Sequence, residues 1–245
     1  TTLFRSLNGM MRKSERLVKE GKLAYALENY NKLVRLYPNN YDVHLKLGDL
    51  YILLNEPERA KIEYYRALKL RGKSRYEAYF AMADLYLSNE EYVLAQSLLM
   101  ELRDVKNVRA IEQTGDFYYK WAEKLKDKDF AEAIRKYKLS CDYYKKINSG
   151  KLKKAEETQI NTYFAFADSL MKKGHKQEAV NMILSSFGIR ENAEGYVKLA
   201  EIYEKDNLDK SIKYFEKAYN IDSSAVDKNR YATVLIQRGD IYKKT

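Results

Sequence analysis

The sequence is poor in residues that break helices and in residues that cross-link chains. Among its 245 residues, two are Pro, ten are Gly, one is Trp and one, Cys141, is Cys. Few prolines leave long helices free to form. A single cysteine excludes an internal disulfide framework and favours a reducing compartment.

Long apolar runs are also missing, so no membrane-spanning segment of about 20 residues is predicted. The first residue is Thr1, and no signal-peptide pattern follows it. We expect a cytoplasmic location, while a periplasmic or envelope-attached one stays open if an N-terminal segment has been trimmed.

No catalytic or metal-binding pattern is present. His44 and His175 are not at ligand spacing, Cys141 has no partner at metal spacing, and each is expected to be structural or at the surface. The stretch RGKSR at 71–75 ends like a phosphate-binding loop, but Ala67 stands where that loop needs Gly. We expect no enzyme, no cofactor and no small-molecule substrate.

What is abundant is a repeat of small residues with a period near 34. In LGDLYILLNEPERAKIEYYRAL (residues 47–68), Gly48 lies on one apolar helix face and Ala60 and Tyr64 on a second. Pro57 suits the first turn of the second helix, with Glu56 as its cap. The first-helix row is Ser14, Gly48, Ala83, Gly115, Ala167, Ala200 and Ala232, and the second-helix row is Ala26, Ala60, Ala95, Ala133, Ala179 and Ser211.

The sequence resembles the tetratricopeptide repeat (TPR) family over nearly its whole length. The segments LKLGDLYILLNEPERAKIEYYRAL and GYVKLAEIYEKDNLDKSIKYFEKAYNID match the helix–turn–helix unit of that family. The Trp usual near the start of the unit is replaced by His44, Tyr79, Ile111, Tyr163 and Tyr196. The resemblance implies an all-α fold, a right-handed α-solenoid of stacked antiparallel helix pairs.

We expect one domain over residues 1–245. Gly115 and Ala133 are 18 residues apart instead of 12, which predicts a longer helix pair there. Asn148-Ser149-Gly150 predicts a turn, with a kink or boundary near 146–158. The repeats are expected at 7–40, 41–74, 76–109, 108–147, 160–192 and 193–224, with an incomplete seventh at 225–245.

The resemblance also implies that the first helix of each unit lines a concave groove. Offsets of −3, +1 and +4 from the small residue share one face of that helix. Phe80 and Phe164 are expected to anchor an amphipathic helix or an extended peptide. The expected groove residues are Met11, Glu15, Leu45, Asp49, Ile52, Phe80, Asp84, Leu87, Asp116, Tyr119, Phe164, Asp168, Met171, Val197 and Glu201.

Six of the seven +1 positions are acidic, although the chain has a net charge of +10. This acidic row would favour Lys or Arg on a ligand, but bonding between repeats and simple solvation stay open as alternatives. Exposed ion pairs contribute roughly 0–1 kcal/mol each, so apolar anchors would supply most of the affinity. Glu15 and Asp49 stand where a clamp for chaperone C-termini needs Asn, so we expect no such clamp.

The positive charge gathers in residues 120–154, which hold 12 basic and 5 acidic side chains. This basic region is either a solvated face or a docking patch for an acidic protein, an anionic lipid or nucleic acid. Most of its aromatic residues fall at core spacing, so stacking on bases is not indicated and nucleic acid is disfavoured. Its members are Lys120, Lys124, Lys126, Lys128, Arg135, Lys136, Lys138, Lys145, Lys146, Lys151, Lys153 and Lys154.

The sequence therefore predicts a non-catalytic adaptor or assembly scaffold that binds a protein or peptide in its groove. Electrostatic binding through the basic region is one alternative. Another is a self-assembling component of a larger bacterial envelope or motility complex, with self-association through the incomplete seventh repeat.

Overall fold

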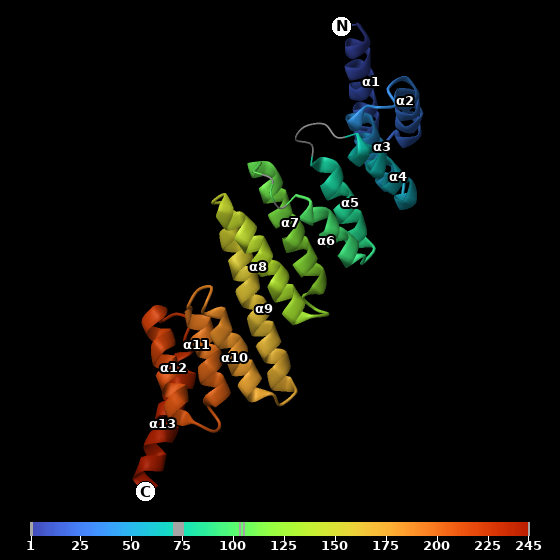
Figure 1. Cartoon of the computed structure of the whole chain (residues 1–245). Helices are drawn as coiled ribbons and strands as arrows, with labels where there is room; N and C mark the ends of the chain where they lie inside the picture. The colour runs from blue at the N-terminus through green and yellow to red at the C-terminus, as the bar shows by residue number, and fades with distance from the viewer. Residues whose placement is uncertain (1, 71–75, 103, 105, 245) are drawn as a thin grey trace. The chain divides into compact units, whose positions relative to one another are not determined.

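The structure, a computed structural model, describes residues 2–70, 76–102, 104 and 106–244, with the side chains of 2–5 and 240–244 left aside. The stretch 71–75, discussed above as a phosphate-loop mimic, lies outside these residues. Every regular element in the described ranges is an α-helix (Figure 1). The helices are α1 (Thr2–Lys19), α2 (Leu23–Leu36), α3 (Tyr41–Leu53), α4 (Pro57–Lys69), α5 (Glu77–Ser88), α6 (Tyr92–Met100), α7 (Val108–Leu125), α8 (Phe130–Lys146), α9 (Leu152–Lys172), α10 (Lys176–Ser186), α11 (Ala193–Tyr203), α12 (Leu208–Ile221) and α13 (Lys228–Lys244).

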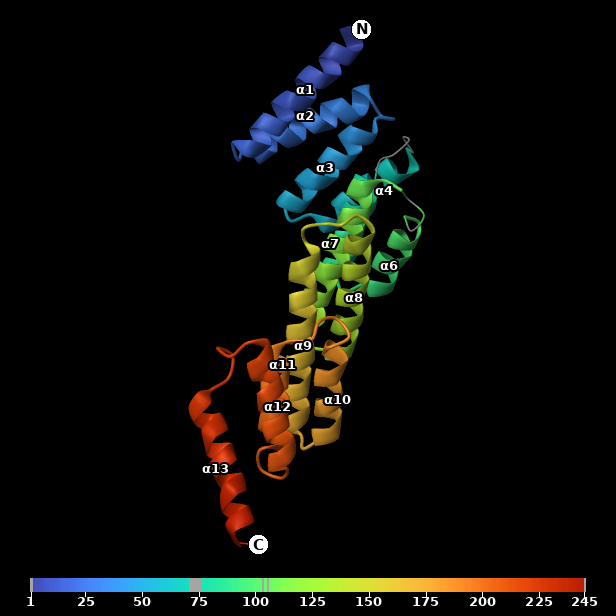
Figure 2. The ribbon, with the colours of Figure 1, turned by 90° about the vertical axis from the view of Figure 1, so that its left-hand side faces the viewer.

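Helices that follow one another in the chain pack side by side. In the first half α1 packs on α2, α3 on α4 and α5 on α6, and in the second half α9 packs on α10 and α11 on α12 (Figures 1 and 2). Each pair also packs on the next within these halves, through α2 and α3, α4 and α5, and α10 and α11. The predicted all-α fold of stacked helix pairs is confirmed.

The chain forms two compact units, residues 1–117 and 118–245, and the division falls within α7. The segment 146–158, where the sequence suggests a kink or boundary, lies inside the second unit. It holds the end of α8, a turn in which Asn148 has a φ of 50°, and the start of the unbroken helix α9. The repeat bounds expected from the sequence stay predictions.

The rows of small residues lie where helices approach most closely. Ser14, Ala26, Ala60 and Ala83 are completely buried in the first unit, as are Ala167, Ala179 and Ala200 in the second. Gly48 leaves no room for a larger residue, because an added Cβ would lie 2.5 Å from the Tyr64 ring. The period found in the sequence is therefore a packing period.

The turn between the two helices of a pair recurs with the same backbone. In four repeats, the residue seven positions after the small residue of the first helix has a positive φ. These residues are Gly21, Asn55, Glu90 and Gly174. Such a left-handed residue ends a helix and favours Gly or Asn. After Asn55, Pro57 stands in the first turn of α4 as predicted. Glu56 is at the N-cap position but makes no side-chain capping bond and pairs with Arg59 instead.

The fourth helix pair is longer than the others near it, as the spacing predicts. Helices α7 and α8 have 18 and 17 residues, against 13 each for α3 and α4. Within the described residues, no helix is both long and apolar enough to span a membrane.

Candidate protein-binding groove

The apolar residues predicted to line the groove divide into buried and accessible ones. Phe80 and Phe164 are only 8% and 3% exposed, so in the isolated chain they support the helices and offer little surface to a ligand. Leu45 and Leu87 are buried as well. The physical reason is that offsets −3 and +4 both lie next to the small residue on the helix surface and therefore border the packed face. Of the remainder, Ile52 is 42% exposed, while Met11, Tyr119, Met171 and Val197 are half-buried.

In the second unit, the acidic row bonds one repeat to the next. Asp168 on α9 accepts from Lys198 on α11, whose Nζ lies 3.0 and 3.1 Å from its two carboxylate oxygens. Glu201 on α11 pairs in the same way with Arg230 on α13. Arg230 also binds Glu204 at 2.7 Å.

These cations share one position in the repeat, two residues before the small residue. The acid of one repeat therefore meets the base of the next repeat, about 30 residues later in the chain. The bases become visible in the sequence only when the repeats are aligned and their −2 positions are compared. These positions hold Arg12, Lys46, Ala81, Gln113, Ala165, Lys198 and Arg230.

In the first unit, Asp49 has different partners. Its Oδ1 accepts from the Tyr64 hydroxyl at 3.1 Å, and its Oδ2 accepts from Lys46 on the same helix at 2.9 Å. Burial raises the pKa of the Tyr64 phenol well above its ordinary value, and the charges of Asp49 and Asp84 raise it further. Burial alone would lower the pKa of Lys46, but the bond to Asp49 and the nearby charge of Glu15 raise it overall.

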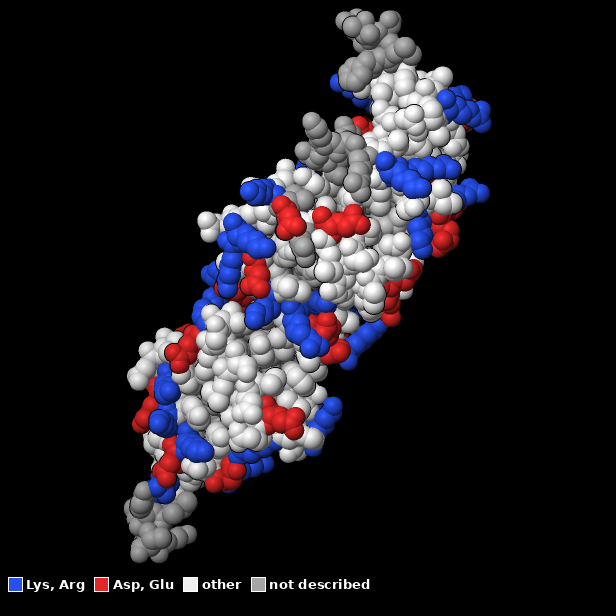
Figure 3. All heavy atoms as spheres, viewed as in Figure 1, with Lys and Arg blue, Asp and Glu red and all other residues white. Residues whose placement is uncertain are grey.

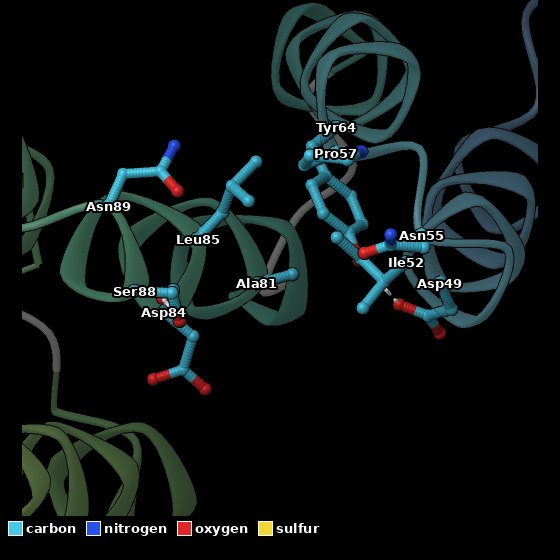
Figure 4. Close-up of a pocket in the computed structure, with 10 residues that line it drawn as sticks. All are labelled: Asp49, Ile52, Asn55, Pro57, Tyr64, Ala81, Asp84, Leu85, Ser88 and Asn89. Carbon is cyan, nitrogen blue, oxygen red and sulfur yellow. Dashed lines mark hydrogen bonds between the residues drawn. The ribbon is translucent and has the colours of Figure 1, made fainter.

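A pocket of about 490 Å³ opens where α3, α4 and α5 meet (Figure 4). Asp49 and Ile52 lie on its α3 side, Tyr64 on α4, and Ala81 and Asp84 on α5. Figure 4 shows the Ala81 methyl directed into the space that faces Ile52 and Asp49. The residues that line it are Asp49, Ile52, Asn55, Pro57, Tyr64, Ala81, Asp84, Leu85, Ser88 and Asn89, which among the described residues include two carboxylates and no Lys or Arg.

Several side chains of the basic region are buried or already bound to acidic side chains, so fewer can bind a ligand than the composition indicates. Lys136 is only 5% exposed, because its ammonium lies 3.7 Å from the Trp121 ring centre and pairs with Glu132 at 3.0 Å. Its inclusion among the docking residues is therefore wrong. Lys126 pairs with Glu123, Arg135 with Glu132 and Lys145 with Glu156.

The other members of the basic region are exposed, and two of them cover aromatic rings. Lys146 lies over Tyr143, and Lys154 lies over Tyr119, whose hydroxyl contacts Thr158. On the face drawn in Figure 3, Lys and Arg are interspersed with Asp and Glu.

Of the two histidines and the cysteine, His44 and Cys141 are buried, and His175 is at the surface. The ring of His44 is buried, with Nδ1 2.6 Å from Glu63 and Nε2 2.8 Å from the Pro38 carbonyl oxygen. The bond to Glu63 raises the pKa of His44 despite its burial. His175 is exposed beside Glu178, and Cys141 is a buried thiol, as expected. Among the described side chains, no group of three or more His, Cys, Asp or Glu could hold a metal ion.

Comparisons with known proteins agree with the repeat. Models of the tetratricopeptide repeat match residues 17–76 and 193–224. The Protein CTR9 homolog of Arabidopsis thaliana is 23% identical over 89% of this chain, which spans 22% of the length of that relative.

Two solved structures are similar. MamA from Desulfovibrio magneticus RS-1 is 18% identical, with 75% of this chain and 94% of that chain covered and a TM-score of 0.49. PilF of Pseudomonas aeruginosa is 15% identical, with 97% and 100% covered and a TM-score of 0.48.

The helix pairs and their row of close contacts define a helical-repeat protein, in which successive first helices present one face side by side. The matched segments identify the repeat: the chain carries tetratricopeptide repeats at residues 17–76 and 193–224. Proteins of this family are in general non-catalytic scaffolds that bind proteins or peptides, and in this general sense the chain is a protein-interaction scaffold.

Proposed function

We propose that the first unit binds a basic segment of a partner protein along the faces of α1, α3 and α5. The observation that carries this proposal is the pocket between α3, α4 and α5. It combines an accessible apolar side chain, Ile52, with the carboxylates of Asp49 and Asp84. Such a surface suits a peptide that alternates apolar and cationic side chains.

Apolar contact has to supply most of the affinity. A micromolar dissociation constant corresponds to about 8 kcal/mol, whereas exposed ion pairs contribute roughly 0–1 kcal/mol each. Because the side chains of Phe80 and Leu87 are buried, the apolar contribution to binding falls to Ile52 and Met11. We therefore expect modest affinity, with the acidic row acting mainly on specificity and on the rate of association.

The second unit is the weaker candidate for the same role. Its acidic side chains Asp168 and Glu201 already bind Lys198 and Arg230. These bases come from the next repeat and lie where a ligand cation would enter, whereas Asp49 binds Lys46 of its own helix. Asp116, Tyr119, Met171 and Val197 stay predicted groove residues.

The test is a peptide selected for binding to the whole chain from a displayed random library. Its dissociation constant is then measured by fluorescence anisotropy with two variants, Ile52→Asp and Ile62→Asp. Ile52 lines the pocket and Ile62 on α4 does not, and both are exposed, at 42% and 52%, so both variants should fold. We expect Ile52→Asp to weaken binding at least tenfold and Ile62→Asp to change it less than about threefold. Equal effects of the two variants would show that the peptide does not bind in the groove of the first unit.

Electrostatic binding through the basic region is a second candidate, favoured by the exposed lysines of α7, α8 and α9. It predicts binding to anionic vesicles or to RNA that falls steeply as salt rises. Reversal of the exposed pair Lys153 and Lys154 to Glu should weaken such binding. No retention of either probe at low salt would dismiss this candidate.

A further inference from the structure

We infer that the pocket between α3 and α5 receives one Lys or Arg side chain of the partner, in the place that a cation of the chain itself occupies between other repeats. This inference rests on the proposed function and names the chemistry of its central contact. At two joins between successive first helices, the base at the −2 position binds the acid of the preceding repeat: Lys198 binds Asp168, and Arg230 binds Glu201. Lys46 stands at the same position after Glu15, but it binds Asp49 on its own helix. At the join between α3 and α5 that position is Ala81.

The internal ion pairs show what the site binds. Lys198 and Arg230 reach back from their own helix to the acid on the preceding first helix. Asp49 stands at the same position of its repeat as Asp168 and Glu201. At the −2 position of the next repeat, α5 carries the methyl of Ala81 in place of a base, and the pocket lies between α3 and α5 (Figure 4).

Asp49 retains the capacity to bind a further cation. A carboxylate has about four acceptor sites, and one bond from Tyr64 and one from Lys46 use about half of them. Its side chain is 41% exposed, so a ligand can reach it. The second carboxylate, Asp84 on α5, also lines the pocket.

Ile52 and Leu85 supply the apolar wall that the stem of a long cationic side chain requires. Lys and Arg bury their methylene groups on apolar surface while the charged end stays with the carboxylates. The pocket of about 490 Å³ is larger than a single Arg side chain, so the partner backbone can pass along its rim.

The direct test uses N-acetyl-arginine amide as the probe and amide chemical shifts of the isotopically labelled whole chain as the readout. We expect saturable shifts at Asp49, Ala81 and Asp84, in the range of about ten millimolar. The neutral analogue N-acetyl-citrulline amide should cause none of them. Absence of saturable shifts at these residues, or equal shifts with the neutral analogue, would overturn the inference.

Substitution at Ala81 separates charge from bulk. Ala81→Arg restores a cation of the chain to this join and should weaken binding of the probe at least tenfold. Ala81→Met adds an unbranched side chain of nearly the volume of Arg without charge and should change binding less than about threefold. Equal weakening by both variants would show that only space matters and would contradict the cation site.

The converse variant, Lys198→Ala, removes the base that binds Asp168 between α9 and α11. It should create a new probe response at Asp168, while the response at Asp49 stays unchanged. No response at Asp168 would mean that the −2 base does not occupy a site for ligand cations, which also contradicts the inference.

The selected peptide then distinguishes the two proposals. If Ile52→Asp weakens its binding and Ala81→Arg does not, the groove binds the partner without the cation site. If neither variant affects it, the proposed function itself fails.

Discussion

The substitution Gly48→Ala tests the close approach of α3 and α4 most directly. The added Cβ would lie 2.5 and 2.6 Å from two carbons of the Tyr64 ring, where ordinary contact begins at about 3.4 Å. Tyr64 is 3% exposed, and its hydroxyl is held by Asp49, so the ring cannot move away freely. The two helices have to separate, or the ring has to leave its position.

The expected cost combines three effects. Overpacking in a filled core destabilises by about 1–3 kcal/mol. Loss of the Tyr64 hydrogen bond to Asp49 adds about 1 kcal/mol. Ala in place of Gly inside a helix returns about 1 kcal/mol. We therefore expect a net decrease of about 1–3 kcal/mol in the free energy of unfolding.

The matched control is Gly9→Ala, because Gly9 also lies inside a helix of the first unit and a Cβ there meets nothing within 4 Å. It should stabilise by about 1 kcal/mol. Urea unfolding followed by far-UV circular dichroism measures both variants, and fluorescence of Trp121, the only Trp, follows the second unit. If Gly48→Ala and Gly9→Ala shift the midpoint equally, the close helix contact is refuted.

Three further predictions concern single side chains. Because Glu63 raises the pKa of buried His44 above its unfolded value, the stabilisation is fully present below about pH 6.5 and is lost as the pH rises through the folded pKa. His44→Gln should remove this pH dependence from urea midpoints, and an unchanged profile would contradict it. Burial raises the pKa of the Cys141 thiol to about 12. At pH 8 this thiol should therefore react with a disulfide reagent roughly a thousandfold more slowly than a free thiol does. Rapid reaction of the folded chain would show that Cys141 is not buried. Glu90 has a φ of 61°, so Glu90→Gly should stabilise by about 0.5–1 kcal/mol in the same unfolding assay, where a loss of stability would argue against the left-handed turn.

The sequence predicts the packing of this chain well because packing follows a period. Gly48, Ala60 and their counterparts recur at about 34 residues, and the structure places them at the helix contacts. Pro57 and the longer pair α7 and α8 follow from local rules in the same way.

The surface is predicted less well, because exposure depends on how closely the next helix approaches. Phe80 and Phe164 fall on the expected groove face by angle alone, yet they are buried, because that face borders the packed face of the helix. Lys136 counts as a surface charge by composition, but Trp121 and Glu132 hold it in the core.

The acidic row illustrates the same limit. The sequence leaves open whether it faces a ligand, the next repeat or solvent. In the second unit it bonds to the next repeat, through Lys198 and Arg230. This outcome requires the distance between helices, which one sequence does not contain.

Self-association stays an alternative for the last helix. Leu235 and Ile236 on α13 are exposed. If a second copy covers them, sedimentation velocity should show a dimer that Leu235→Ser with Ile236→Ser converts to a monomer. A monomer at all concentrations would dismiss it.

The most direct test of the central claim, that the first unit recognises a cationic side chain of its partner, is a double-mutant cycle between Asp49 and the selected peptide. Asp49→Asn is combined with replacement of each peptide Lys or Arg by Gln, and the dissociation constants are measured by anisotropy. We predict that one peptide position couples to Asp49, so that the double variant binds about threefold to fivefold more tightly than independent losses would give. Strictly additive losses at every cationic position would contradict the account.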